Sequence, residues 1–69
     1  MSGEWILVYS TDKEYQAELV RQMLANEGII AEIMNKQDSA YPVFGDIEIY
    51  VQVTDILKSI QLIKKFESE

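Results

Sequence analysis

The chain contains neither cysteine nor histidine among its 69 residues. The absence of cysteine excludes disulfides and thiolate metal sites within the chain. The absence of histidine removes the most frequent general base and the commonest protein ligand of metals. A domain of this length buries only about 60% of the surface that its unfolded chain exposes. We therefore expect no metal and no cofactor, and we expect added stability to come from oligomerisation.

Basic residues are also few, since six Lys and Arg stand against twelve Asp and Glu for a formal net charge of −6. Nucleic-acid-binding proteins usually carry clustered Lys and Arg, because neutralisation of phosphates dominates their affinity. Here the basic residues are scattered, and only Lys64 and Lys65 are adjacent. The charge pattern therefore predicts a protein that does not bind nucleic acid.

Long hydrophobic runs are missing as well. No apolar run approaches the roughly 20 residues that a membrane span requires. The first residues, "MSGEW", lack the basic region and the apolar core of a signal peptide. The hydrophobic content of 48% is nevertheless too high for a disordered chain. We expect one cytoplasmic domain over residues 1–69, with no membrane segment and an ordered core over about 4–66.

The first elements along the chain read as a strand followed by a helix. The apolar run Glu4 to Ser10 has the length and composition of a strand, with Trp5, Leu7 and Tyr9 on one face. The segment from Ser10 to Gly28 is predicted to be helical. Its apolar stripe consists of Leu19, Val20, Met23 and Leu24, extended by Tyr15 or Gln16.

Both ends of this first helix carry recognisable signals. Thr11 followed three residues later by Glu14 predicts a capping box, in which each side chain binds a backbone N–H of the first turn. Gly28 suits the left-handed position that ends many helices. We therefore expect the helix to begin next to Thr11 and to end at Gly28.

The second half of the chain predicts two strands and a second helix. The second strand is expected over Ile29 to Met34, and the third over Asp46 to Val53. The third strand alternates cleanly, with Ile47, Ile49, Val51 and Val53 on one face and Glu48, Tyr50 and Gln52 on the other. The final helix is expected to start at an N-cap of Thr54 or Asp55. Its predicted apolar stripe is Ile56, Leu57, Ile60 and Ile63.

The order strand, helix, strand, strand, helix predicts an α+β fold with a split βαββα sheet. A third strand that pairs antiparallel between the first two gives the sheet order 1-3-2, with both helices on one face, as in half of a ferredoxin-like fold. The ferredoxin-like fold would place a fourth strand beside the first. The sequence shows no such strand, so we expect the first strand to have an unpaired edge.

An unpaired edge with apolar residues invites association. We expect the sheet face opposite the helices to carry an apolar patch that forms a homo-oligomer, most simply a two-fold dimer. The residues predicted for this oligomer interface are Trp5, Leu7, Tyr9, Met34 and Tyr50. In the alternative arrangement, Trp5 and Tyr9 pack on Tyr41 and Phe44 within one chain.

The connection "NKQDSAYPVFGD", Asn35 to Asp46, is far longer than the two to five residues of a typical hairpin. Long loops held by rigid elements often carry function. The predicted binding loop comprises Lys36, Gln37, Asp38, Ser39, Tyr41 and Phe44. Its aromatic residues are of the kind that anchor protein contacts. In the alternative, the apolar loop residues cover one end of the sheet and leave only Lys36 to Ser39 exposed.

Several short segments together resemble a known family. They are "VYST", "EYQAELVRQMLANEGIIAEIMN" and "FGDIEIYV", followed by a closing helix. The chain resembles, over roughly residues 5 to 66, the prokaryotic signal-transducing protein family, a small bacterial domain of unknown function with a PII-like fold. The resemblance implies a regulatory or sensing role, with partner contacts in the connection between the second and third strands. This chain lacks the basic phosphate-binding residues of PII proteins, so nucleotide binding is not implied.

Two classes of function follow. The first is a signal-transducing or regulatory interaction module that binds a protein partner or a small ligand through residues 35–46 and the open sheet face. The second is a small enzyme, either hydrolytic through Lys36 and Ser39 or metal-dependent through Asp46 and Glu48 with Asp38. Because a serine nucleophile needs an oriented base and the chain has no histidine, we expect an interaction module without enzymatic activity.

Overall fold

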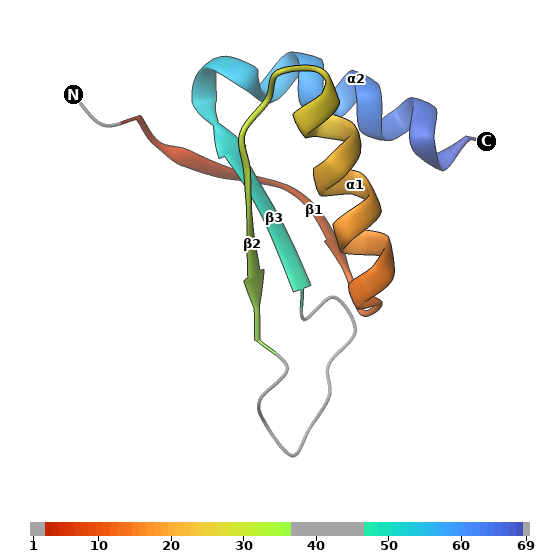
Figure 1. The fold of residues 1–69 in the computed structure, drawn as a ribbon. Coiled ribbons are helices and arrows are strands. Elements are labelled where there is room, and N and C mark those ends of the chain that lie inside the picture. Colours follow the sequence, from red (N-terminus) through yellow and green to blue (C-terminus); the bar gives the residue numbers. More distant parts are fainter. Residues whose placement is uncertain (1–2, 37–46, 69) are drawn as a thin grey trace.

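The computed structural model describes residues 3–36 and 47–68. Along the chain, its elements are strand β1 (Trp5–Thr11), helix α1 (Glu14–Asn26), strand β2 (Ala31–Asn35), strand β3 (Ile47–Gln52), a short 3-10 helix η1 (Val53–Asp55) and helix α2 (Ile56–Glu67). Figure 1 shows this order as a small sheet with two helices packed beside it. The predicted succession of strand, helix, strand, strand and helix is confirmed.

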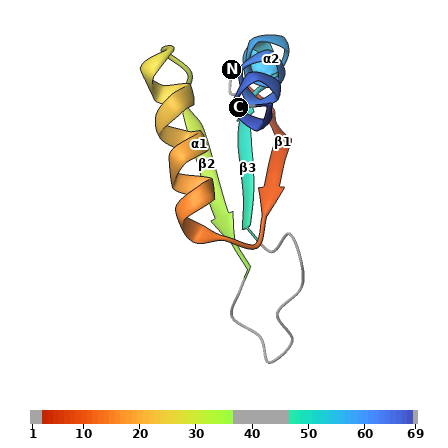
Figure 2. The same cartoon turned by 90° about the vertical axis from the view of Figure 1, so that its right-hand side faces the viewer.

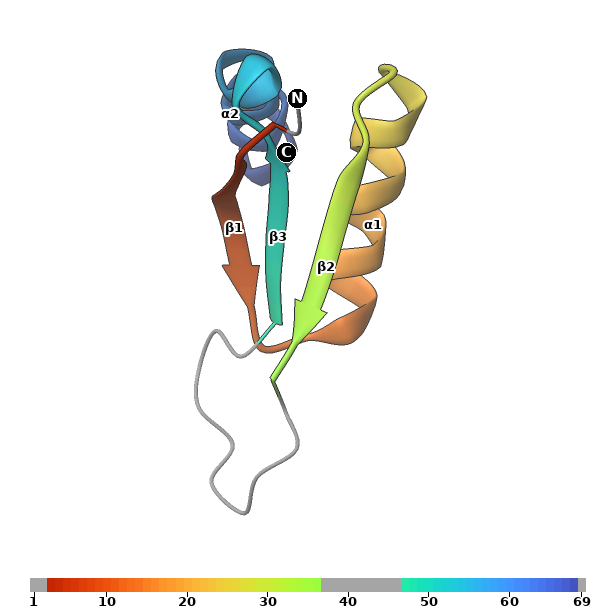
Figure 3. The same ribbon diagram turned by 90° about the vertical axis from the view of Figure 1, so that its left-hand side faces the viewer.

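The three strands form one sheet in the order β1-β3-β2. Strands β1 and β2 each pair antiparallel with β3, so they run parallel to one another. Both helices lie on the same side of the sheet, with α1 beside β2 and α2 on the side of β1 and β3 (Figures 2 and 3). These findings confirm the predicted α+β fold with sheet order 1-3-2.

The hydrophobic core lies between the sheet and the two helices. Its buried apolar side chains are Ala17, Val20, Leu24, Ile29, Ile47, Ile49, Val51 and Ile63. The three from β3 are at most 1% exposed, which confirms the face predicted from the alternation in this strand. Burial of one such side chain stabilises a fold by about 1.5–3 kcal/mol. The central strand therefore anchors the domain.

Strand β1 contains a bulge, which changes the face that its second half presents. Leu7 lies opposite Tyr50, but Tyr9 lies opposite Ile49, and the register shifts between them. The extra residue, Val8, reverses the alternation, because residues directly opposite each other in a sheet share a face. Tyr9 therefore lies on the helix face together with Ile49, and the prediction that it shares a face with Trp5 and Leu7 is wrong.

The phenol of Tyr9 shows the consequence of this reversal. Its hydroxyl oxygen accepts a hydrogen bond from Gln16 Nε2 of α1 at 3.1 Å. Tyr9 is half-buried and packs against the core. The Tyr9 side chain therefore links β1 to α1 within one chain, on the face opposite Trp5 and Leu7.

Helix α1 begins later than the capping-box pattern indicates. Its N-cap residue is Lys13, whose side chain makes no capping hydrogen bond. Thr11 belongs to β1, lies opposite Ile47, and accepts a hydrogen bond from the Lys13 backbone N–H at 3.2 Å. The capping box is therefore wrong, because pairing with β3 extends the strand through Thr11 and moves the helix start to Glu14.

The end of α1 follows the predicted pattern. Gly28 has a φ of +81°, in the left-handed region. Its N–H donates to the Ala25 carbonyl at 3.0 Å, and the Ile29 N–H donates to the Leu24 carbonyl at 2.9 Å. These two bonds form a Schellman motif. Since Ile29 is only 2% exposed, the motif also directs the chain into the core.

In both helices, fewer apolar side chains are buried than the predicted apolar stripes contain. In α1, Leu19 and Tyr15 are exposed, and Ala17 is buried instead. In α2, Leu57 and Ile60 are exposed, whereas Ser59 and Ile63 are buried. A three-stranded sheet covers only part of each helix, and small side chains occupy two of the buried positions. The predicted roles of Leu19, Leu57 and Ile60 in the core are wrong for this reason, and the same holds for Val53, which lies in η1 and is exposed.

Lys64 and Lys65, the two adjacent basic residues of the sequence, lie in the last turn of α2. Positive charge there complements the partial negative charge of the helix C-terminus. Within residues 3–36 and 47–68, neither helix has the length and apolar character needed to cross a membrane.

Candidate functional site: the open sheet face

The sheet face that points away from both helices is the candidate site, and we call it the open face. Strand β3 directs Glu48, Tyr50 and Gln52 to it, because their neighbours Ile47, Ile49 and Val51 point into the core. Pairing then places further side chains on the same face, namely Trp5, Leu7 and Ser10 from β1 and Glu32 and Met34 from β2. None of the described helices covers this face (Figure 3).

The open face combines exposed apolar groups with acidic ones. Trp5, Leu7 and Met34 are 42%, 46% and 51% exposed, and Tyr50 is half-buried between them. Four of the five residues predicted for the oligomer interface therefore lie on one surface. The fifth, Tyr9, faces α1. The open face therefore carries four of the five predicted residues together with the acidic Glu32 and Glu48.

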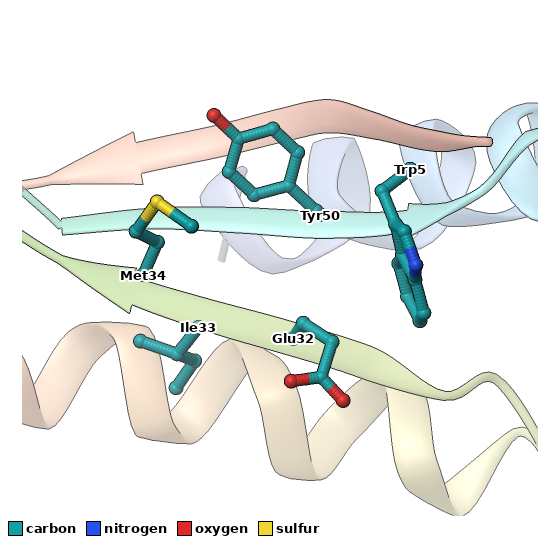
Figure 4. Close-up of a pocket in the computed structure, with 5 residues that line it drawn as sticks. All are labelled: Trp5, Glu32, Ile33, Met34 and Tyr50. Carbon is teal, nitrogen blue, oxygen red and sulfur yellow. The ribbon is translucent and has the colours of Figure 1, made fainter.

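A groove of about 580 Å³ crosses this face and is lined by Trp5, Glu32, Ile33, Met34 and Tyr50. Figure 4 shows the indole of Trp5 at one end of the groove and the side chains of Tyr50 and Met34 at the other. The side chain of Glu32, on β2, lies across the groove from Tyr50, and its carboxylate points away from the Tyr50 phenol. Glu32 makes no ion pair or hydrogen bond with another described residue. Sequence reasoning did not identify Glu32 as a site residue.

The signal that could have identified Glu32 is the alternation of β2, which places Glu32 and Met34 on one face. The alternation alone does not show which residues of β3 lie beside Glu32. The register between β2 and β3 decides this, and it places Glu32 opposite Tyr50. A single sequence does not contain this register, because many offsets between two strands satisfy the same alternation. The groove therefore emerges only from the pairing of all three strands.

A second polar group on the open face is centred on Glu48. The Tyr50 hydroxyl donates to Glu48 Oε1 at 2.7 Å, and Lys36 Nζ lies 3.1 Å from the same oxygen. The Tyr50 hydrogen bond and then the Lys36 hydrogen bond hold the pKa of Glu48 below its ordinary value. The hydrogen bond to Glu48 in turn raises the pKa of Lys36 and the pKa of Tyr50. One carboxylate oxygen of Glu48, Oε1, is therefore held by both Tyr50 and Lys36.

Most of the predicted binding loop lies outside the described residues. Lys36 is described and points to the open face through its ion pair with Glu48. The other predicted loop residues, Gln37, Asp38, Ser39, Tyr41 and Phe44, are not among residues 3–36 and 47–68. Their role in binding, and the alternative in which Tyr41 and Phe44 cover the sheet, stay predictions.

The metal-dependent alternative also depends on residues beyond this range, since Asp38 and Asp46 are not described. In the described ranges, no group of three or more Asp and Glu side chains is arranged to hold a metal ion. Glu48 is the one member of the proposed carboxylate set within these ranges, and its Oε1 is engaged by Tyr50 and Lys36.

Comparison of the chain with protein-family models, with curated proteins and with solved structures found no match.

Proposed function

We propose that this chain is a signal-transducing or regulatory interaction module that binds a protein partner through its open face and the adjoining connection of residues 35–46. The observation that carries the proposal is the exposure of Trp5, Leu7 and Met34 on one uncovered face of the sheet. Apolar groups gathered on one surface and mixed with polar groups are typical of protein contact sites. The resemblance to a signal-transducing family supports the same class of function.

A partner of different composition suits this face better than a second copy packed face to face. Two open faces in contact would bring the Glu32 carboxylates of both copies into one interface, and each chain carries a net charge of −6. Like charges in an interface oppose association. A partner with basic groups would meet the same carboxylates favourably.

The predicted two-fold dimer is a second proposal, favoured by a separate observation. Strands β1 and β2 each pair with β3 alone in the described sheet, so each leaves an outer edge without a strand partner. Unpaired edges can join two copies into one continuous sheet. Light scattering at micromolar concentration tests this arrangement, and a species of 8.0 kDa alone would exclude it.

The enzyme alternative gains no support from the open face. Its most organised polar group is the Lys36, Glu48 and Tyr50 cluster, in which the carboxylate pKa is lowered and Oε1 accepts two bonds. A general base at neutral pH usually has a carboxyl pKa raised by its surroundings. The cluster fits a structural or recognition role better than proton transfer.

The decisive experiment compares two matched variants in affinity capture from the native cell lysate. Leu7→Arg places a charge on the open face, and Leu57→Arg places the same charge at an exposed position of α2 on the helix side. Circular dichroism first verifies that both variants fold. We expect the wild type and Leu57→Arg to retain the same partners and Leu7→Arg to lose them. Equal retention by Leu7→Arg would overturn the proposal, and deletion of residues 36–44 measures what the connection adds.

A further inference from the structure

The groove on the open face has a composition that selects the charge of its occupant. It offers an indole, a phenol ring, a thioether and one carboxylate, from Trp5, Tyr50, Met34 and Glu32. Aromatic faces attract cations through their quadrupole. Of the two acidic residues at this place, Glu48 is engaged by Lys36 and Tyr50, whereas Glu32 has no partner among the described residues.

Other classes of occupant fit less well. An anion would meet Glu32 and a chain of net charge −6. A neutral apolar group would remove water from the Glu32 carboxylate without supplying a hydrogen bond, and an unpaired charge is costly to bury. A cation on an aliphatic stem satisfies both parts of the groove, because the stem packs on Met34 and the indole while the charge meets Glu32.

The position of the groove beside an edge strand indicates how such a cation is delivered. Glu32 and Met34 both belong to β2, which pairs with β3 on one side only in the described sheet. An extended segment that adds to the outer edge of β2 would bind through main-chain hydrogen bonds. Every second side chain of that segment would point to the open face, where the groove lies.

From these three observations, and resting on the proposed interaction function, we propose that the groove receives a lysine or arginine side chain from an extended segment of a partner protein. Trp5 flanks the cationic group, Met34 and Tyr50 contact its aliphatic stem, and Glu32 pairs with the charge. The main chain of the segment supplies affinity along β2, and the groove supplies selectivity for a basic residue.

Trp5 makes the proposal directly measurable, because it is the only tryptophan of the chain and it lines the groove. The probes are three short extended peptides of identical valine-rich sequence, with lysine, norleucine or glutamate at the central positions. Butylammonium serves as a small free cation. Binding is followed by Trp5 fluorescence and by backbone chemical shifts of β2. We expect saturable binding of the lysine peptide and at least about tenfold weaker binding of the other two peptides, the size of effect typical for one charged contact.

Two variants, each lacking one carboxylate, distinguish a direct contact between the lysine peptide and Glu32 from the general attraction of a cationic peptide to an acidic chain. Glu32→Gln removes the charge in the groove, and Glu67→Gln removes the same charge from exposed α2 on the other side of the sheet. We expect Glu32→Gln to weaken the lysine peptide to about the level of the norleucine peptide. The Glu67→Gln variant should bind the lysine peptide as the wild type does.

Other results would contradict the proposed lysine or arginine site, and each would identify which part of the proposal is wrong. Equal binding of the lysine and norleucine peptides, or an unchanged affinity in Glu32→Gln, would overturn the cation site. Butylammonium binding as tightly as the lysine peptide would indicate a site for a small amine rather than for a partner's side chain. If no peptide binds while lysate capture still depends on Leu7, the inference fails and the proposed interaction function stands. If capture is also independent of Leu7, both fail.

Discussion

The Tyr50 hydroxyl donates to Glu48 Oε1 at 2.7 Å, two residues back along the same strand. This bond is the largest cause of the lowered Glu48 pKa, ahead of the Lys36 hydrogen bond. We therefore expect Tyr50→Phe to raise the pKa of Glu48 toward the ordinary value for a glutamate, as measured by NMR titration of its carboxyl carbon. Tyr15→Phe is the matched control, since Tyr15 is 64% exposed on α1. An unchanged Glu48 pKa in Tyr50→Phe would contradict the assigned cause.

The same cluster predicts a pH dependence of stability. The folded-state pKa of Glu48 is lowered, so its contribution is fully present above the unfolded value of about 4.3 and is lost as the pH falls through the lower folded value. We expect the free energy of unfolding to decline below about pH 4.3, and to decline less steeply in Glu48→Gln. Urea denaturation from pH 7 to pH 2 measures both slopes. Parallel slopes would show that Glu48 does not contribute.

Substitutions at Gly28 measure the effect of backbone conformation at the end of α1 separately from side-chain packing. A Cβ placed there would meet no atom within 4 Å, so only the φ of +81° opposes a side chain. We expect Gly28→Ala to lower the free energy of unfolding by about 1–2 kcal/mol, the usual penalty for a left-handed L-residue. Gly28→Asn should lower it less, because asparagine adopts this conformation more readily. Chemical denaturation distinguishes the two variants, and equal losses would point away from the backbone explanation.

Leu24 and Leu57 are both leucines on helices, yet the structure separates them completely. Leu24 is fully buried in the core, whereas Leu57 is 77% exposed. Leu24→Ala should lower the free energy of unfolding by about 2–5 kcal/mol through lost burial and the cavity that remains. Leu57→Ala should change it by less than about 0.5 kcal/mol. A large loss in Leu57→Ala in a solution of monomers would contradict the placement of α2.

Ser59 is buried in α2 and its hydroxyl has no hydrogen-bond partner within the described part of the chain. A buried hydroxyl without a partner destabilises a fold, and alanine has a higher helix propensity than serine. We expect Ser59→Ala to raise the free energy of unfolding by about 1 kcal/mol. Ser68→Ala, at an exposed serine near the end of α2, is the control. A clear loss of stability in Ser59→Ala would reveal a hydrogen bond in solution.

Local sequence patterns were sufficient to predict the order of the helices and strands, the buried face of β3 and the end of α1. The alternation of Ile47, Ile49 and Val51 predicted the buried face of β3, because the period of two in a strand is fixed by backbone geometry. Gly28 predicted the end of α1, because few other residues tolerate its conformation. These inferences depend on neighbours along the chain, and they are confirmed.

The helix stripes show where local patterns were insufficient. Ala17 and Ser59 are buried, although neither is a large apolar residue, and the large apolar Leu19 and Leu57 are exposed. The period of a helix defines its possible faces but not which face the sheet covers. That selection was made by the width of the three-stranded sheet and, for α1, by its late start at Glu14, whereas α2 begins at Ile56 after the predicted N-cap Asp55.

The sequence by itself determined a βαββα order, an acidic chain without histidine or cysteine, and a central strand with one apolar face. Only the tertiary structure decided that Val8 forms a bulge, that Tyr9 turns toward α1, and that Glu32 lies in a groove with Trp5. The physical reason is that strand register is a non-local property. A one-residue offset exchanges the two faces of a strand, and the pairing with β3 fixes that offset.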